Sequence, residues 1–295
     1  MTRTVANLPA AQLAPLAAAY DAAVAAKRRQ LVVGVLLLMV LVGLAAWSGE
    51  VDPAKFWRGL PRFASYFHDI LPTLRLATLT ADLAEWFWNL DGWLALLWDT
   101  LLVAYIGTLA GAIAGFCLCF LAASNLTRSA PLRFAARRTL EFCRTVPEIV
   151  FALMFVYALG FGPMPGVLAI AIHTAGALGK QFCEVVENVD MRPVEGLTAS
   201  GGTYVEIVRF AVVPQVLSNF VSYSLLRFEI NVRGATVLGF VGAGGIGKEL
   251  ISSIRQFYYA DVSAILLIII CTVVAIDLLT ERLRHRLLSL DEGRK

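Results

Sequence analysis

Long apolar runs constrain this chain more than any other feature of its sequence. A helix needs about 20 apolar residues to cross about 30 Å of hydrocarbon, and in lipid it satisfies its own backbone hydrogen bonds. Hydrophobic residues make up 58% of the 295 residues and charged residues only 16%, a balance typical of integral membrane proteins. The sequence therefore predicts an all-α integral membrane protein with six transmembrane helices. The predicted spans are residues 31–47, 94–123, 139–159, 166–182, a fifth span from about Pro214, and 262–279.

Basic residues between these runs predict the orientation. Lys27, Arg28 and Arg29 precede the first run, and the loop at 124–138 carries four arginines without an acidic residue. Such clusters stay in the cytoplasm by the positive-inside rule, and both termini are then expected there. A net charge of +3, placed in this way, indicates topology rather than nucleic-acid binding. The expected parts are a cytoplasmic N-terminal arm (1–30), the first transmembrane helix (31–47), a periplasmic or interfacial aromatic-rich segment (48–95), a membrane core (96–283) and a cytoplasmic tail (284–295).

A polar island at 193–216 interrupts the apolar runs. Pro193 suits the first turn of a helix, and Gly201 and Gly202 suit a sharp corner. Thr203, followed three residues later by Glu206, has the spacing of a capping box that restarts a helix. The island thus predicts two short helices that meet at a glycine corner, the shape of a docking element for a soluble partner. From local chemistry alone, an ordinary cytoplasmic loop is an equal alternative.

The segment 222–239 places Arg227, Glu229, Asn231 and Arg233 near membrane depth. A charge at the centre of a span costs roughly 2.5–3.5 kcal/mol on insertion scales, so it normally faces a water-filled path or a partner. Glu229 and Arg233 can pair at four-residue spacing. Arg227 has no such partner in the sequence, and an arginine facing a cavity suits an oxyanion. The alternative is a structural or hydrated role in the headgroup zone.

Glu148 and His173 are further polar groups at membrane depth. We include both among the candidates for a translocation path, and an interhelical hydrogen bond is the expected role of each. No catalytic or metal-ligating group is predicted, because the three histidines lie far apart and lack acidic neighbours at ligand spacing.

The glycine-rich stretch at 242–248 imitates a nucleotide-binding loop. A P-loop needs Ser or Thr after its lysine, whereas Glu249 follows Lys248 here, and no alternating strand–helix pattern accompanies it. The interpretation is a turn that packs closely at the outer end of a span. Its residues are Gly242, Gly244, Gly245 and Gly247.

The polar island resembles the EAA loop of ABC importer permeases, whose pattern is Glu-Ala-Ala, a glycine and then Leu-Pro. Glu195, Gly201 and Pro214 match it, while Gly196 stands at the first Ala position and Val213 replaces Leu. The resemblance implies a coupling loop at 190–214 that docks on an ATP-hydrolysing subunit. The residues assigned to coupling are Glu195, Gly196, Leu197, Gly201, Gly202 and Pro214.

A closer resemblance, to phosphonate transport permeases, runs from about residue 99 to 286. Its strongest stretches are 144–162, 172–174, 193–215 and 222–247. It implies a type I ABC importer permease core in the bacterial inner membrane, for phosphonate, phosphite or hypophosphite. Implied partners are two ATPase subunits, a periplasmic binding protein and a second copy of the permease, with which the chain is expected to form a homodimer.

The same resemblance implies that ATP and Mg²⁺ bind to the partner ATPase and that this chain holds no cofactor. The alternatives are an ABC permease for another solute such as methionine, for which the arginine cluster has no use, and an ion-coupled secondary transporter. The latter predicts inverted repeats and no docking loop, and the sequence shows no clear repeat.

Overall fold

The computed structural model describes residues 10–73, 75 and 77–292, which divide into two units, Met1–His68 and Asp69–Lys295. In the first unit a single helix, α1 (Ala10–Ser48), covers both the predicted arm and the first predicted span. Residues 1–9 of the arm lie outside the described residues. The next helix, α2 (Pro53–Ile70), begins in this unit and is strongly amphipathic, with Phe56 and Trp57 exposed. Such a helix suits the surface of a membrane.

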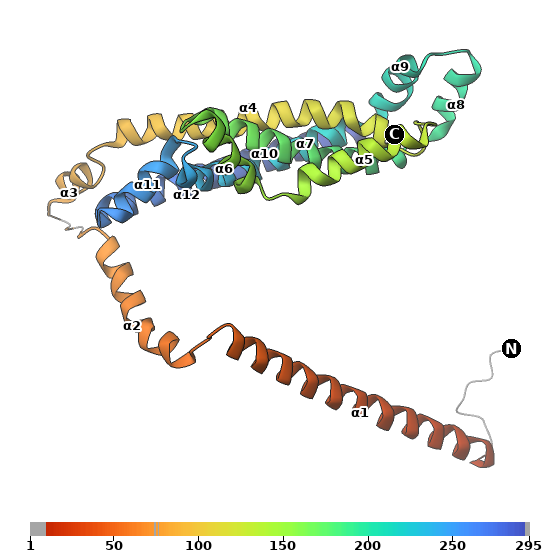
Figure 1. Cartoon of the computed structure of the whole chain (residues 1–295), viewed down its shortest axis with the longest axis horizontal. Coiled ribbons are helices and arrows are strands. Elements are labelled where there is room, and N and C mark those ends of the chain that lie inside the picture. The colour runs from red at the N-terminus through yellow and green to blue at the C-terminus, as the bar shows by residue number, and fades with distance from the viewer. Residues whose placement is uncertain (1–9, 74, 76, 293–295) are drawn as a thin grey trace. The chain divides into compact units, whose positions relative to one another are not determined.

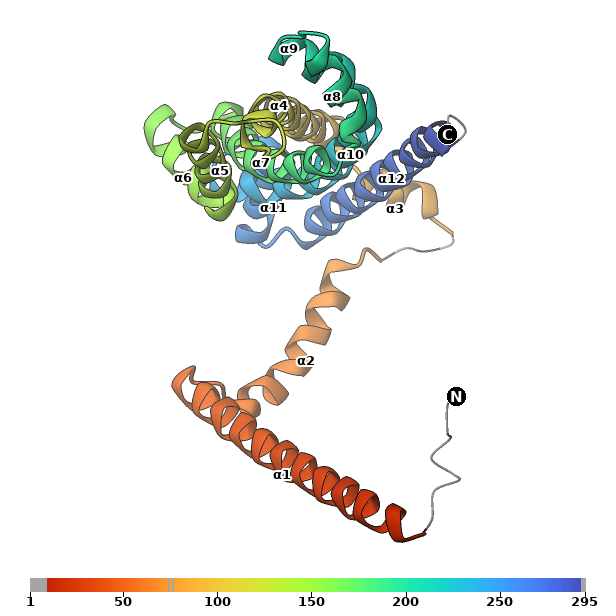
Figure 2. The ribbon, with the colours of Figure 1, turned by 90° about the vertical axis from the view of Figure 1, so that its right-hand side faces the viewer.

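The second unit is a helical bundle (Figures 1 and 2). Its helices are α3 (Leu79–Trp86), α4 (Leu90–Ala122), α5 (Ala130–Thr145), α6 (Glu148–Leu159), α7 (Pro163–Glu187), α8 (Met191–Ala199), α9 (Tyr204–Ile207), the π-helix η2 (Val208–Val212), α10 (Val213–Leu238), the 3₁₀-helix η3 (Gly239–Val241), α11 (Gly245–Arg255) and α12 (Tyr259–Glu292). The central helix is α7, which packs against α4, α5, α6 and α10, while α12 packs against α10 and α11.

Glycines let α4 and α7 approach closely. A Cβ on Gly111 would lie 2.6 Å from the Cβ of Thr174 and 2.7 Å from the carbonyl oxygen of Ala171. One turn away in each direction, Gly107 and Gly115 meet α7 in the same way. Small residues at this spacing bring helix backbones together, and packing of this kind drives helix association where lipid removes the hydrophobic difference.

The span predicted at 139–159 is not one straight helix, because α5 and α6 meet at a bend of 86°. The residue before a proline is disfavoured in the α region, since the proline ring would strike its backbone. Accordingly Val146, which precedes Pro147, has extended backbone angles (φ −74°, ψ 124°) and ends α5. The loop predicted at 124–138 is also shorter than expected, because Arg133, Arg137 and Arg138 lie on α5.

Four described helical runs are long and apolar enough to span a membrane, or five if the bent pair counts as one span. They include Tyr204–Val241, so the fifth span begins before Pro214 as a continuation of α9. The central helix α7 falls outside this set because His173, Lys180 and several glycines lower its hydropathy. It is also enclosed by other helices. The all-helical membrane class is confirmed, while the count of six spans remains a prediction.

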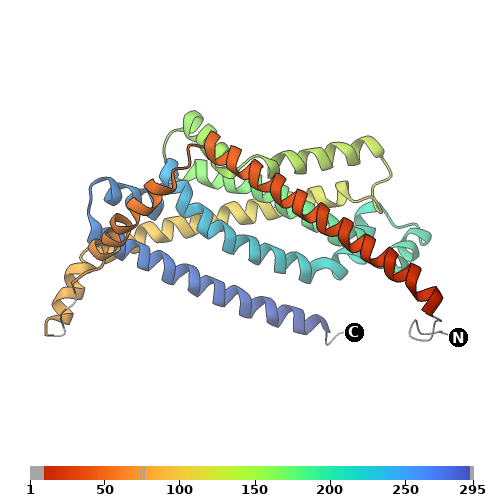
Figure 3. The ribbon, with the colours of Figure 1, turned by 90° about the horizontal axis from the view of Figure 1, so that it is seen from below.

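The bundle has two distinct ends (Figures 1 and 3). At one end α8 and α9 project beyond the other helices, and the C-terminal part of α12 points the same way. At the opposite end lies α11. We refer to these as the α8 end and the α11 end.

We expect the glycine contacts to limit stability. Gly111→Val should lower the free energy of unfolding by on the order of 2–3 kcal/mol, since its side chain would overpack the α4–α7 contact. Ala110→Val, one residue earlier on the exposed face of α4, should change it little. Thermal unfolding of the purified variants in detergent measures the difference. Equal melting temperatures of the two variants would show that the α4–α7 contact accommodates a valine side chain without loss of stability.

Candidate functional site

Residues 190–207, here called the projecting segment, form a helix, a corner and a second helix at the α8 end. Asp190 caps α8 by accepting a hydrogen bond from the N–H of Arg192 at 3.0 Å, and Pro193 lies in the first turn. The corner is at Gly201, whose φ of +82° favours glycine. The Gly202 N–H then donates to the carbonyl oxygen of Leu197 at 3.0 Å and closes the corner.

The second helix of the segment begins with the predicted capping box. The Thr203 hydroxyl accepts from the N–H of Glu206, and the Glu206 carboxylate accepts from the N–H of Thr203 at 2.7 Å. Helix α9 then continues through η2 into α10 without a break. The π-turn ends just before Pro214, whose ring would strike the carbonyl four residues earlier in a regular α-helix. The predicted helix–corner–helix is present, but its second helix is the first part of a long span.

Gln215 attaches the start of the projecting segment to α10. Its side-chain oxygen accepts from the N–H of Asp190 at 3.0 Å, and its amide nitrogen donates to the carbonyl oxygens of Asp190 at 3.2 Å and Ala211 at 2.7 Å. One side chain thus satisfies both backbone groups of Asp190. Because Asp190 lies 25 residues before Gln215, this is a tertiary contact that joins α8 to α10.

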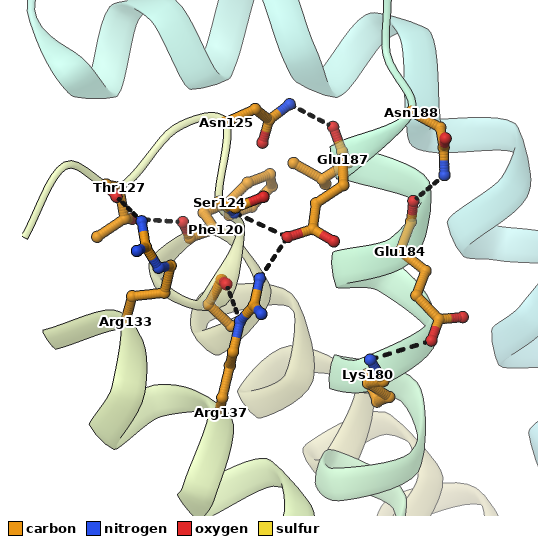
Figure 4. A network of polar contacts seen from close by, with 12 residues as sticks. Phe120, Ser124, Asn125, Thr127, Arg133, Arg137, Lys180, Glu184, Glu187 and Asn188 are labelled. Carbon is orange, nitrogen blue, oxygen red and sulfur yellow. Dashed lines mark hydrogen bonds and ion pairs between the residues drawn. The ribbon is translucent and has the colours of Figure 1, made fainter. Parts of the chain in front are cut away.

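A charged network attaches the end of α7 to the segment that links α4 and α5 (Figure 4). Glu187 accepts from the N–H of Ser124 at 2.8 Å and pairs with Arg137, whose Nε donates to the carbonyl oxygen of Ala122 at 2.8 Å. Burial works against the charged form of Glu187, but the Ser124 hydrogen bond and the Arg137 cation outweigh it and hold the pKa of Glu187 below its usual range. The carboxylate is therefore ionised at neutral pH.

The outer surface of the projecting segment is open. Glu195, Gly196 and Gly201 are exposed, whereas Leu197 is half-buried against the aromatic core at this end of the bundle. Pro214, at the start of α10, is exposed as well, and Gly202 is half-buried. Behind α8 a cavity of about 900 Å³ reaches to the α4–α5 link. The residues predicted to couple therefore divide into four that are exposed and two that are half-buried. The exposed ones are Glu195, Gly196, Gly201 and Pro214, and the half-buried ones are Leu197 and Gly202.

The polar residues of α10 lie on two opposite faces. On one, Arg227 contacts α7, with its Nη2 2.6 Å from His173 Nδ1 and its Nε donating to Thr174 Oγ1 at 3.4 Å. Glu148 Oε2 lies 3.6 Å from the same His173 nitrogen. The sequence-based view of Arg227 as an arginine without a partner is wrong, because the pattern along one helix cannot show a histidine on another.

Asn231 lies one turn further along this face and is fully buried. Its amide nitrogen donates to Thr108 Oγ1 at 2.8 Å and to Thr174 Oγ1 at 2.9 Å. It therefore ties α10 to both α4 and α7, a structural contact at the centre of the bundle.

On the other face of α10, Glu229 pairs with Arg233 as the four-residue spacing predicts. Arg233 also lies 3.9 Å from Asp277 of α12. The residues 227–233 are therefore not one cluster: Arg227 and Asn231 face α7, and Glu229 and Arg233 face α12.

The glycine-rich turn joins η3 to α11 at the α11 end. Gly242, Gly244 and Gly245 all have positive φ, and a Cβ on Gly247 would lie 1.8 Å from the carbonyl oxygen of Thr236. The N–H of Ile246 donates to Thr100 Oγ1 at 2.9 Å. The turn thus packs the start of α11 tightly against α10, in keeping with the packing interpretation.

Three contacts escaped sequence reasoning: those of Gln215, of Asn125 and of Tyr204. Asn125 donates to the carbonyl oxygen of Val186 at 2.8 Å, and the Tyr204 hydroxyl donates to that of Phe120 at 3.0 Å. Each joins residues more than twenty positions apart, and helical periodicity carries no signal for such pairs.

Residues 107–289 match the family of binding-protein-dependent transport system inner membrane components. The phosphite transport system permease protein PtxC of Stutzerimonas stutzeri is 38% identical over 252 residues, which cover 85% of this chain and 87% of the relative. The phosphate-import permease protein PhnE of Mycolicibacterium smegmatis is 42% identical over 191 residues, 65% of this chain and 36% of the relative.

Among solved structures, the MetNI methionine ABC transporter in an inward-facing conformation aligns with a TM-score of 0.57. The alignment covers 66% of this chain and 95% of that chain at 17% identity. At this identity the likeness shows the fold alone, which is that of type I ABC importer permeases.

We expect Gln215 to hold the projecting segment in place. Gln215→Leu keeps the size of the side chain but removes its hydrogen bonds, and a typical hydrogen bond contributes about 1 kcal/mol, or roughly a fivefold change in local opening. Amide hydrogen exchange of residues 190–199 should accelerate by about that factor. Asn219→Leu, one turn further along α10, is the control and should leave exchange unchanged. Equal exchange in both variants would assign the attachment to other contacts.

Proposed function

This chain belongs to the family of binding-protein-dependent transport system inner membrane components, and from that premise we propose that it is the permease subunit of an ATP-driven importer for phosphonate or a related phosphorus oxyanion. The observation that carries the proposal is the way the projecting segment is mounted. It exposes Glu195 and Gly201 at one end of the bundle, and Gln215 attaches it to a membrane-spanning helix. A segment so attached transmits the motion of a partner to the spans.

Members of this family are multi-pass membrane proteins that work with an ATPase and a binding protein. We propose that two ATPase copies and two identical permease copies assemble in the inner membrane of a bacterium, with both termini of this chain in the cytoplasm. ATP and Mg²⁺ then bind only to the ATPase subunits, and this chain carries no cofactor. The glycine-rich turn at 242–247 packs against α10. This packing role supports the proposal that the turn binds no nucleotide.

The mechanism uses the two ends of the bundle. The binding protein delivers the anion at the α11 end, beside the glycine-rich turn. ATP-driven closure of the ATPase pair moves the projecting segments at the α8 end. Since Gln215 of α10 bonds to Asp190, which starts the projecting segment three residues after the end of α7, the two helices rock together between outward- and inward-open states.

The charges on α10 and α7 support an anionic cargo. Arg227 is half-buried beside His173, next to a cavity of about 450 Å³. A guanidinium binds phosphate-like oxygens through two parallel N–H donors. We therefore place the path on the face of α10 that carries Arg227, with His173 and Glu148 as its neighbours, and leave Glu229 and Arg233 to the contact with α12.

The proposal is tested by ATPase activity of the chain reconstituted with the ATPase and binding protein encoded beside it. We expect stimulation by phosphite or methylphosphonate and none by methionine. Stimulation by methionine alone would keep the fold but assign another cargo, and uptake driven by an ion gradient without ATP would indicate a secondary transporter.

A pair of variants within the same assay tests the projecting segment. Gly201→Val places a branched residue at positive φ, which costs about 1–3 kcal/mol of strain, while space for the side chain itself is open. It should abolish stimulation without preventing membrane insertion. Ser200→Val puts the same side chain at φ −77° and should retain stimulation. Full stimulation of the Gly201→Val protein would argue against docking at the corner.

The two arginines of α10 give a further prediction. Arg227→Gln should lower uptake of radiolabelled phosphite by about tenfold or more, because a hydrogen bond to a charged group contributes roughly 1.5–3 kcal/mol. Arg233→Gln makes the same change on the α12 face, where the side chain is 52% exposed, and should lower uptake far less. Both should bind the ATPase normally in a pull-down. An equal loss in both variants would place the path elsewhere.

A further inference from the structure

A continuous groove runs between α7 and α10. One cavity of about 450 Å³ lies beside His173 and Arg227, and a second of about 520 Å³ lies beside Asn188 and Gln215. Both are far larger than the roughly 30 Å³ that one water occupies in the liquid. The residues common to the two walls are Gln181, Glu184 and Tyr223. The two cavities are therefore parts of one groove.

The groove follows one face of each helix toward the α8 end. Along α7 and the residue that follows it, the groove is lined at successive turns from His173 to Asn188, and at about 1.5 Å per residue this stretch rises about 22 Å. On α10 it runs from Arg227 to Gln215. It thus leads from the polar contact at the centre of the bundle to the attachment of the projecting segment.

The charges in the groove are ordered along its length. Its inner part is lined by three cations, Arg144, Lys180 and Arg227, against one carboxylate, Glu184, which it shares with the outer part. Arg227 has Glu148 and His173 near it, whereas no carboxylate pairs with Arg144 among the ion pairs of the described residues. Toward the α8 end the charged side chains are the carboxylates of Glu184 and Asp190. An anion is therefore attracted to the inner part and repelled near the exit.

Lys180 lies where the sign changes. Its Nζ is 3.1 Å from Glu184, one turn further along α7, and the two side chains are 43% and 57% exposed (Figure 4). An exposed ion pair of this kind contributes little to stability, because water screens the two charges. Lys180 can therefore exchange Glu184 for another oxyanion at little cost.

The exit of the groove is built from the attachment itself. Gln215 and Asp190 line its last part and are hydrogen-bonded to each other. A displacement of the projecting segment therefore changes the width of the exit, so that release of an anion and motion of the segment are linked.

We propose that the α7–α10 groove is the inward-facing binding and release path for the anion, and that Lys180 leaves Glu184 to bind it. The proposal rests on the proposed function for the identity of the anion, a phosphorus oxyanion, but not for the preference of the groove for negative charge. Arg144 and Lys180 are then binding residues, in addition to Arg227.

The test is chemical labelling of A177C, on the groove wall between His173 and Lys180. The variant is made in a chain whose five native cysteines are replaced, and studied in the ATP-free complex with its ATPase in nanodiscs. A negatively charged and a positively charged methanethiosulfonate reagent are compared, with S200C on the exposed corner as the reference thiol. Focusing of the potential in a charged cleft should raise the negative-to-positive rate ratio of A177C roughly tenfold above that of S200C.

Variants at Lys180 and Glu184 identify the cause. K180Q should remove most of the preference of A177C for the negatively charged reagent, K180R should keep that preference, and E184Q should increase it. Methylphosphonate and phosphite should slow labelling of A177C but not of S200C. Equal ratios at both thiols, or a ratio at A177C that K180Q leaves unchanged, would overturn the proposal.

The outcome separates this proposal from the proposed function. A177C could prefer the negative reagent and be protected by another anion but not by phosphite or methylphosphonate. That result would support the groove as an anion path and contradict a phosphorus oxyanion as the cargo. Phosphite-stimulated ATPase activity without any charge preference at A177C would keep the cargo and overturn the groove.

Discussion

The close contact of α4 with α7 is the constraint on which the rest of this molecule depends. Lipid is as apolar as the side chains it surrounds, so helices associate by close packing and by polar contacts. Three glycines of α4 allow that approach, and at its centre Asn231 of α10 bonds to a threonine of each helix. With α7 held in the middle of the bundle, its His173, Lys180 and Glu187 have fixed positions.

Because α7 has a fixed position, the projecting segment that follows it is anchored to the bundle. Glu187 at the end of α7 is held by Ser124 and Arg137, and Asp190, three residues later, is held by Gln215 of α10. The segment therefore starts beside two anchored residues, one at the end of α7 and one bonded to α10. A force on its exposed corner reaches α7 and α10 directly, and these are the two helices that line the polar groove.

Much of the fold and part of the site could be predicted from the sequence, because both rest on local rules. Apolar runs predict helices, and the capping box at Thr203 and the positive φ at Gly201 follow from residue type. The bend at Pro147 also obeys a local rule, but a proline inside an apolar run reads equally well as a kink within one span. The partners of Arg227 and Gln215 lie on other helices, and single-sequence periodicity says nothing of how two helices are rotated against each other.

The arrangement of charge also explains how a membrane protein can carry several arginines and carboxylates at depth. An isolated arginine at the centre of a span is costly, yet Arg227 lies in a cavity beside His173, Thr174 and Glu148. A path for a small anion must attract it without holding it tightly. Partly satisfied cations such as Arg227 beside His173 and Lys180 beside Glu184 meet that requirement: they lower the barrier to entry, and the neighbouring acceptor regains the cation when the anion departs.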